Sequence, residues 1–393
     1  MLIQNATITD DTGTRLGSVQ ITNGMITAVG ESLPVQSGDE VIDAAGKTLL
    51  PAFIDLHCHF RTPGFTYKED ITSGSRAAAA GGYTLVNCMA NTKPVCSTAE
   101  IAHAVMAEAR RVGLCDVNQV VSITKDFDGK TLTHLESLPE DIRFISEDGK
   151  GVQSNAVMWH TMQIAAQKGL TVMSHAEDMD ISGEDYRLAE NIETARNIFL
   201  AQYTGAHLHM CHVSTQQALA DVTAAKQRGV HVTCEVTPHH IWFADNGFRV
   251  NPPIRTAADV AYIIEAMHRG EVDAIATDHA PHSPEDKAKG APGMVGMETA
   301  FGVCYTKLCV QNGLPLQRLS RMMSRGPAEI LGVNKGRIAP GFDGDAVLVD
   351  TQAVYTVHAD ALHGKSHNTP FDGTALQGRV LLTVKQGKVT YKA

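Results

Sequence analysis

The chain of 393 residues carries 33 Lys and Arg against 43 Asp and Glu, a formal net charge of -10, and 43% of its residues are hydrophobic. This composition supplies a sizeable core and excludes a disordered chain, while the acidic excess argues against a nucleic-acid-binding protein. The length predicts two domains, or one large domain with an appendage.

The N-terminal residues resemble no secretory signal, and no apolar run approaches the ~18 residues that a membrane span needs. The eight Cys residues include no C-x-x-C pair and are typical of scattered reduced thiols. We therefore expect a cytoplasmic protein without a membrane partner.

Both ends of the chain consist of short runs in which apolar and polar residues alternate, as in β-strands. Asn23-Gly24, between two such runs, is a strong hairpin-turn signal. We predict that residues 1–48 and 333–393 form one small β-sandwich domain.

Between these ends, short apolar runs alternate with amphipathic helical stretches, which indicates a parallel sheet built from βα units. Helices are expected at Ser97–Val112, Val157–Lys168, Thr215–Arg228 and Ala257–Arg269. The eight candidate strands are Leu49–Ile54, Thr84–Met89, Val117–Ser122, Ile142–Ile145, Thr171–Ser174, Ala206–Cys211, Val230–Val236 and Ala274–Thr277. Residues 49–332 match a (β/α)8 TIM barrel, typically ~250 residues long, and an open doubly wound sheet is the alternative.

The first of these strands is followed by the sequence His57-Cys-His59, which continues its extended pattern. Side chains two residues apart share one face of a strand, so both imidazoles can bind one metal ion. The pattern alone is weak, because His207-Leu-His209 repeats it. We interpret His207 and His209 as packing toward helices, away from His212.

Metal-binding residue types follow five of the eight predicted strands, and strand ends of a barrel open onto one rim, where its active sites lie. These residues are His57, His59, Asp148, His175, His212 and Asp278. They are too many for one zinc ion but suit two that share a carboxylate and a hydroxide. Such a site is equipped to hydrolyse an amide or a related C–N bond.

Several motifs, in order along the chain, resemble those of dihydroorotases in the amidohydrolase superfamily. They are Asp55-Leu-His-Cys-His-Phe-Arg61, Met89-Ala-Asn-Thr-Lys-Pro94, His175-Ala-Glu-Asp178, His212-Val-Ser-Thr215, Asn251-Pro-Pro-Ile-Arg255 and Thr277-Asp-His-Ala-Pro-His282. The resemblance implies the reversible conversion of N-carbamoyl-aspartate to dihydroorotate, a step of pyrimidine biosynthesis.

The resemblance also implies roles for these residues. His57, His59 and Asp278 would hold one zinc ion, and His175 and His212 the other. Asp278 would also move the proton between the bridging hydroxide and the leaving ring nitrogen. Relatives bridge the metals with a carboxylated lysine or an aspartate. Here Asp148 is the predicted bridge, Glu147 is the second choice and a carboxylated Lys150 is the third.

The substrate carries a carboxylate although the protein is acidic, so a local cation is needed. The resemblance assigns this role to Arg61, whose guanidinium can grip a carboxylate through two bonds, with Asn91 and His282 as partners. Asn251 would hydrogen-bond the ring amide. Thr62, Ala90 and Glu147 depart from the family pattern, which affects no predicted ligand other than the choice of bridge.

Two other functions stay open. One is another cyclic-amide hydrolase, a hydantoinase or an allantoinase, which would share the two-metal site. The other is a silent dihydroorotase-like scaffold for aspartate transcarbamoylase, although all six metal positions hold competent residues. We expect a homodimer, and an active enzyme could still associate with that transcarbamoylase.

Overall fold

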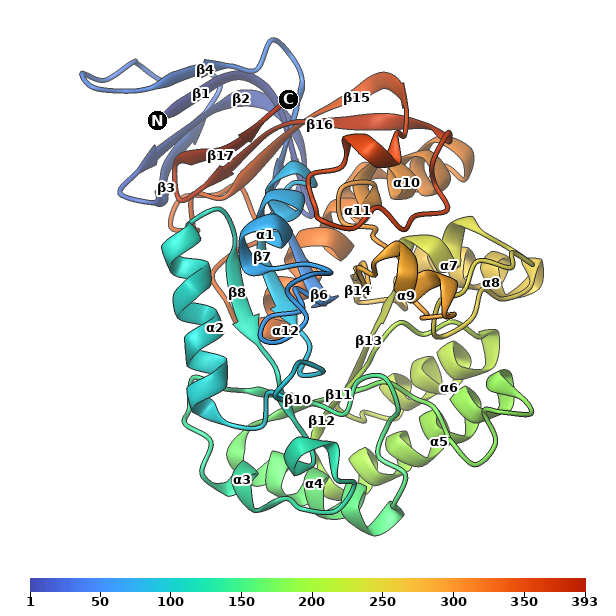
Figure 1. Ribbon diagram of the computed structural model, residues 1–393. Helices are drawn as coiled ribbons and strands as arrows, with labels where there is room; N and C mark the ends of the chain where they lie inside the picture. The colour runs from blue at the N-terminus through green and yellow to red at the C-terminus, as the bar shows by residue number, and fades with distance from the viewer.

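A computed structural model describes residues 1–393 and contains two regions (Figure 1). One region is a β domain near which both ends of the chain lie. The other consists of parallel strands with helices around them. None of the helices combines the length and apolar character that a bilayer crossing requires.

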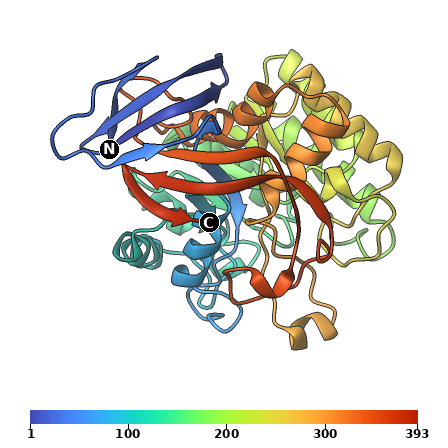
Figure 2. The ribbon, with the colours of Figure 1, turned by 90° about the horizontal axis from the view of Figure 1, so that it is seen from above.

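The β domain contains one hydrogen-bonded sheet in the order β17-β16-β15-β5-β1-β2-β3, with β4 paired to β1. Figure 2 shows the N-terminal strands, in blue, beside the C-terminal strands, in red. The sheet joins the two ends because β5 lies between β1 and β15. The strands are β1 (Leu2–Asp10), β2 (Gly13–Thr22), β3 (Met25–Gly30), β4 (Val41–Asp43), β5 (Thr48–Pro51), β15 (Ala346–Thr356), β16 (Ala375–Lys385) and β17 (Lys388–Lys392).

The second region holds two groups of parallel strands, in the orders β14-β13-β12-β11-β10-β9 and β6-β7-β8. This arrangement confirms the predicted α/β class with parallel strands. The strands are β6 (Phe53–Cys58), β7 (Tyr83–Cys88), β8 (Asp116–Gln119), β9 (Val121–Ser122), β10 (Phe144–Ser146), β11 (Thr171–Ser174), β12 (His207–Met210), β13 (Val232–Val236) and β14 (Ala274–Ile275).

The first and last parallel strands contact each other through a buried carboxylate. Asp55 accepts hydrogen bonds from the backbone N–H of Thr277 at 2.9 Å, from the Thr277 hydroxyl, and from the backbone N–H of His57 at 3.2 Å. Just beyond, His59 N–H donates to the carbonyl of His279 at 2.9 Å. Burial raises the pKa of Asp55 to about 7, although these hydrogen bonds act to lower it.

The predicted strand Leu49–Ile54 is in fact two strands. Leu49 and Leu50 belong to β5 in the β domain, and Phe53 begins β6 in the parallel region. The apolar run is continuous because both strands are fully buried, so hydrophobicity does not mark the break between them. The break follows Pro51, which lacks a backbone donor.

The longer helices begin at side-chain caps that the sequence provides. Thr98 caps α2 by accepting from the N–H of Ile101, and Thr256 with Asp259 forms a capping box at the start of α8. The longer helices are α1 (Ile71–Ala80), α2 (Ala99–Val112), α4 (Asn155–Lys168), α5 (Tyr186–Thr204), α6 (Gln216–Gln227) and α8 (Ala257–Arg269). The four predicted helices thus match α2, α4, α6 and α8 to within two residues at each end.

Shorter helical segments fill the remaining connections. They are α3 (Thr133–Glu136), α7 (Pro238–Trp242), α9 (Pro284–Ala288), α10 (Ala300–Cys304), α11 (Leu316–Ser320) and α12 (Gly326–Leu331). Residues Tyr305–Gln311 and Arg321–Arg325 are π-helical, and Lys125–Phe127 and Ala359–Ala361 form 3-10 turns. No sequence pattern predicted the π-helical segments.

The Phe53 ring connects the parallel strands to the C-terminal helices. It is fully buried, stacks on Phe301 with ring centroids 5.3 Å apart, and meets Tyr83 edge-on at 5.6 Å.

We expect Phe53→Ala to lower the free energy of unfolding by about 3–5 kcal/mol through lost burial and a cavity. The shift of the urea midpoint measures this loss. Phe199→Ala on α5, where the ring is 68% exposed, is the matched control and should change it by about 0.5 kcal/mol or less; equal losses would contradict the packing role.

Candidate active site

A cavity of about 200 Å³ lies where the parallel strands end. Nine of the ten predicted site residues line it, and the tenth, His57, lies fully buried beside it. The nine are His59, Arg61, Asn91, Asp148, His175, His212, Asn251, Asp278 and His282. Residues from across the chain therefore converge on one small volume.

At the cavity, the buried His57 and the lining residues His59 and Asp278 form one group of potential metal ligands. Their ligand atoms all lie within 4.8 Å of one another. His59 Nε2 is 3.2 Å and His57 Nε2 is 3.7 Å from Asp278 Oδ1. Two imidazoles and one carboxylate are a donor set that zinc prefers.

Asp148 connects this group to a second pair of imidazoles. Its Oδ1 lies 3.2 Å from His57 Nε2, 3.5 Å from His175 Nδ1 and 3.9 Å from His212 Nε2. Its Oδ2 lies 3.7 Å from His59 Nε2. One carboxylate thus faces all four histidines, which suits a ligand shared between two metal positions.

The chemistry of the cluster fits a bound cation. His57 Nε2 is buried and makes no hydrogen bond, although it faces Asp148 and Asp278. Burial acts to lower the pKa of His175, but Asp148 and Glu177 raise it to about 10. The site therefore places two carboxylates beside an unpartnered buried ligand atom, and a metal ion would bind both kinds of group.

Three site residues adopt a left-handed backbone conformation, with φ of 56° at Arg61, 36° at His212 and 46° at Asp278. Such conformations are uncommon outside glycine and concentrate where side chains must be aimed for function. All three follow the end of a parallel strand. The local chain direction therefore turns these side chains into the cavity.

The two alternative bridging residues point elsewhere. Glu147 accepts a hydrogen bond from the backbone N–H of Thr124 at 2.9 Å and another from its hydroxyl. Lys150 donates to the carbonyl of Phe127 at 2.9 Å. Neither residue lines the cavity, whereas Asp148 does.

The predicted carboxylate-binding residues lie at one side of the cavity. Arg61 is 9% exposed, and its guanidinium lies 3.3 Å from both the Pro281 carbonyl and His282 Nε2. The other ring nitrogen of His282 lies 3.3 Å from Lys68 Nζ. Burial, followed by the charges of Arg61 and Lys68, lowers the pKa of His282 to about 3, so this imidazole is neutral.

Asn91 contacts the predicted metal ligands directly. Its Oδ1 lies 2.9 Å from His59 Nδ1, and its Nδ2 donates to Asp148 Oδ2 at 2.9 Å. A hydrogen on Nδ1 leaves Nε2 of His59 free to face the metal cluster. Asn91 is therefore placed to orient two ligands as well as to line the cavity.

Glu177 is a site residue that we did not predict. Its Oε2 lies 3.0 Å from His175 Nε2 and accepts from Asn251 Nδ2 at 2.9 Å. It thereby fixes the ring of His175 with Nδ1 toward Asp148. The sequence signal that could have identified Glu177 is its position two residues after the candidate ligand His175.

The interpretation that His207 and His209 pack toward helices is wrong. His209 is fully buried, and both rings contact the neighbouring strand β13. His207 and His209 both contact the hydroxyl of Thr233, and His209 also contacts Glu235. An alternating strand pattern assigns side chains to two faces without saying which one is the interior.

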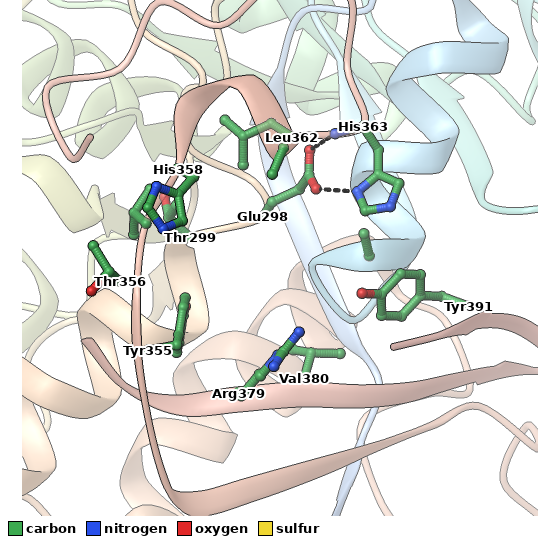
Figure 3. Close-up of a pocket in the computed structure, with 13 residues that line it drawn as sticks. Glu298, Thr299, Tyr355, Thr356, His358, Leu362, His363, Arg379, Val380 and Tyr391 are labelled. Carbon is green, nitrogen blue, oxygen red and sulfur yellow. Dashed lines mark hydrogen bonds and ion pairs between the residues drawn. The ribbon is translucent and has the colours of Figure 1, made fainter. Parts of the chain in front are cut away.

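A larger cavity of about 340 Å³ lies beside the β domain (Figure 3). Its wall includes Glu298, which accepts from the backbone N–H of His363 at 2.7 Å and lies 2.6 Å from the ring Nδ1 of that residue. Tyr355, Arg379 and Tyr391 also line it. None of the predicted ligands does, so size alone does not identify the reactive site.

Comparison with known proteins identifies the family. The amidohydrolase family model matches residues 48–390. A dihydroorotase from Clostridium botulinum (strain Eklund 17B / Type B) is 48% identical, over 100% of this chain and 99% of the relative. The chain belongs to the dihydroorotases of the amidohydrolase family. Another dihydroorotase, from Trichlorobacter lovleyi, is 39% identical over 95% of this chain and 94% of that protein.

Solved amidohydrolase structures share the fold. An L-hydantoinase (dihydropyrimidinase) from Arthrobacter aurescens has a TM-score of 0.90 at 22% identity, covering 99% of this chain and 95% of its own. A D-hydantoinase (dihydropyrimidinase) from Thermus sp. has a TM-score of 0.85 at 25% identity, covering 100% and 96%. Membership of the family confirms the predicted resemblance, and it identifies this chain as a cyclic-amide hydrolase.

The placement of Asp148 generates a test of the bridge. Asp148→Asn removes the charge that faces four imidazoles, so we expect most bound metal to be lost from folded protein, as measured by elemental analysis. Glu147→Gln and Lys150→Met are the controls and should keep the metal content of the unmodified chain. Metal loss in either control, with retention in Asp148→Asn, would reassign the bridge.

Proposed function

We propose that the chain interconverts (S)-dihydroorotate and N-carbamoyl-L-aspartate in pyrimidine biosynthesis. The observation that carries this proposal is the grouping of four candidate ligand histidines, two aspartates and a buried arginine in and beside one cavity, in a chain that belongs to the dihydroorotases. The first set of side chains suits amide hydrolysis. The arginine suits a substrate that carries a carboxylate.

We propose two zinc ions as the cofactor. His57, His59 and Asp278 would hold one, His175 and His212 the other, and Asp148 both. When bound, the ions would lower the pKa of a water molecule and polarise the substrate carbonyl. The grouping of the ligand atoms and the unpartnered Nε2 of His57 support this assignment.

Asp278 is the proposed general base and acid. Burial acts to raise its pKa, but the hydrogen bond to His59 and the nearby imidazoles hold the pKa well below its ordinary value. The side chain is therefore an anion that can take a proton from the attacking water. As the C–N bond breaks, Asp278 returns this proton to the leaving ring nitrogen, and in ring closure the proton moves in the opposite direction.

Arg61, Asn91 and His282 are proposed to bind the substrate carboxylate, and Asn251 to bind the ring amide. Arg61 is buried and engages only Pro281 and His282 at 3.3 Å, so donors of its guanidinium remain for a ligand. The Nδ2 of Asn251 already donates to Glu177. Its carbonyl oxygen is the atom left to accept from a ring N–H.

We also propose the finer architecture that places this site. The parallel strands would close as a (β/α)8 barrel over residues 49–332, with a β-sandwich built from residues 1–48 and 333–393. The contacts of Asp55 with Thr277 and the parallel bridge between Cys58 and His279 support closure. The start of β5 at Thr48 suggests that the β domain extends slightly past residue 48.

An assay in both directions tests the proposed function. Ring closure consumes one proton, because N-carbamoyl-aspartate has one more carboxylate than dihydroorotate, so lower pH should favour dihydroorotate at equilibrium. We expect purified protein to catalyse both directions and to leave hydantoin and allantoin largely unchanged. Turnover of either of those compounds without dihydroorotate cleavage would instead identify a different cyclic-amide hydrolase.

The carboxylate contact is tested by Arg61→Met. A lost charge-assisted contact costs about 2–3 kcal/mol or more, so we expect kcat/KM for dihydroorotate to fall roughly 100-fold. Elemental analysis should still find near two zinc ions per chain. Arg76→Met, an exposed arginine on α1, is the control and should retain activity. An Arg61→Met protein with unchanged kcat/KM would refute the assignment.

A further inference from the structure

The two ring nitrogens of His57 face different surroundings. Nε2 faces the carboxylates of the metal cluster, whereas Nδ1 lies 3.3 Å from Oε1 of Glu235 on β13. Both side chains are essentially fully buried, and neither of these two atoms makes a regular hydrogen bond. Glu235 is thus the carboxylate that faces the second nitrogen of this histidine.

Glu235 is held in turn by His209. Its Oε2 lies 3.0 Å from His209 Nε2, and the side chains of both residues are 0% exposed. The two oxygens of Glu235 therefore face two imidazoles from different strands, His57 on β6 and His209 on β12. An ionised carboxylate only accepts hydrogen bonds, so each imidazole nitrogen that faces it carries a hydrogen.

A chain of further contacts fixes His209. With hydrogen on Nε2, its Nδ1 accepts from the Thr233 hydroxyl at 2.8 Å. That uses the only proton of the hydroxyl, so Thr233 Oγ1 accepts from His207 Nε2 at 2.9 Å, and His207 Nδ1 accepts from Thr171 Oγ1 at 3.0 Å. This assignment gives every nitrogen and hydroxyl of the series a partner while the imidazoles stay neutral. The series of hydrogen bonds extends from the start of β12 toward the metal cluster.

We propose that Glu235, supported by His209, is a positioning residue that holds His57 with hydrogen on Nδ1, so that Nε2 faces the metal. A ligating histidine whose other nitrogen donates to a carboxylate has a fixed ring orientation and is a stronger donor to the metal. The inference rests on the proposed role of His57 as a ligand. It also accounts for His209, which contacts neither the cavity nor the metal cluster.

A third metal site is the competing explanation for the same residues. Ligand atoms of His57, Cys211 and Glu235 also lie within 4.8 Å of one another. Both oxygens of Glu235 already face imidazoles. These atoms therefore suit a hydrogen-bonded support better than a metal site.

The test measures the zinc affinity of folded protein by competition with a chelator, with Glu235→Gln as the main variant. Glutamine presents one N–H donor toward a nitrogen that needs an acceptor, and it lacks the charge. We expect the affinity for at least one zinc ion to fall about 10- to 100-fold, with the wild-type number of sites. Added zinc should restore part of the lost turnover.

His209 provides a graded pair of variants. Gln at this position keeps a donor toward Glu235, whereas Leu removes it. We expect zinc affinity in the order wild type, His209→Gln, His209→Leu. Glu190→Gln is the matched control, because Glu190 is also buried and ionised but pairs with Arg255 at 2.8 Å and contacts no histidine. It should lose stability without a change in the zinc affinity of the folded fraction.

The outcomes separate the two levels of the hypothesis. A wild-type chain that binds no zinc would overturn the proposed metal centre itself. A wild-type chain that binds zinc, with Glu235→Gln within twofold of its affinity, would overturn the positioning role alone. Three zinc ions per wild-type chain, falling to two in Glu235→Gln, would replace it with the third metal site.

Discussion

A single buried carboxylate connects the two ends of the parallel strand series. Asp55 accepts hydrogen bonds from the backbone N–H of His57 on its own strand and from the backbone N–H and the hydroxyl of Thr277 beyond the last strand. The next residue after Thr277 is Asp278. The side chain of Asp55 therefore positions the backbone at or next to two candidate ligands, His57 and Asp278, which lie 221 positions apart in the sequence. The geometry of the remaining cluster depends on this contact, because His57 also faces Asp148 and Glu235.

The carboxylates and the cations of the site form two separate groups. Asp148, Asp278 and Glu177 lie among the imidazoles, while Arg61 and Lys68 lie around His282. The first group suits metal cations and the second suits a carboxylate. A net charge of -10 therefore does not prevent binding of an acidic molecule, because the relevant field is local. The same separation gives a bound molecule one preferred orientation.

Metal-binding residues that form a motif or follow an apolar run were predictable, and a lone acid inside a buried strand was not. His57, His59 and Asp278 could be found because each is a metal-binding type directly beside an apolar run. Glu235 lies inside a buried strand, where a lone acid has no distinctive spacing, and its partners come from two other strands. Likewise the class and most helices followed from periodicity, whereas the break at Ala52 did not, because the strands on both sides of it are equally buried.

The order of strands in the β domain has a consequence for synthesis of the chain. β5 is made early, yet one of its edges pairs with β15, which begins almost 300 residues later at Ala346. Until then, the backbone groups on that edge of β5 lack their final partner. Unpaired strand edges promote association between chains. The C-terminal strands therefore cover this edge of the N-terminal sheet only once they have been made. A chain interrupted before residue 346 would be prone to aggregate.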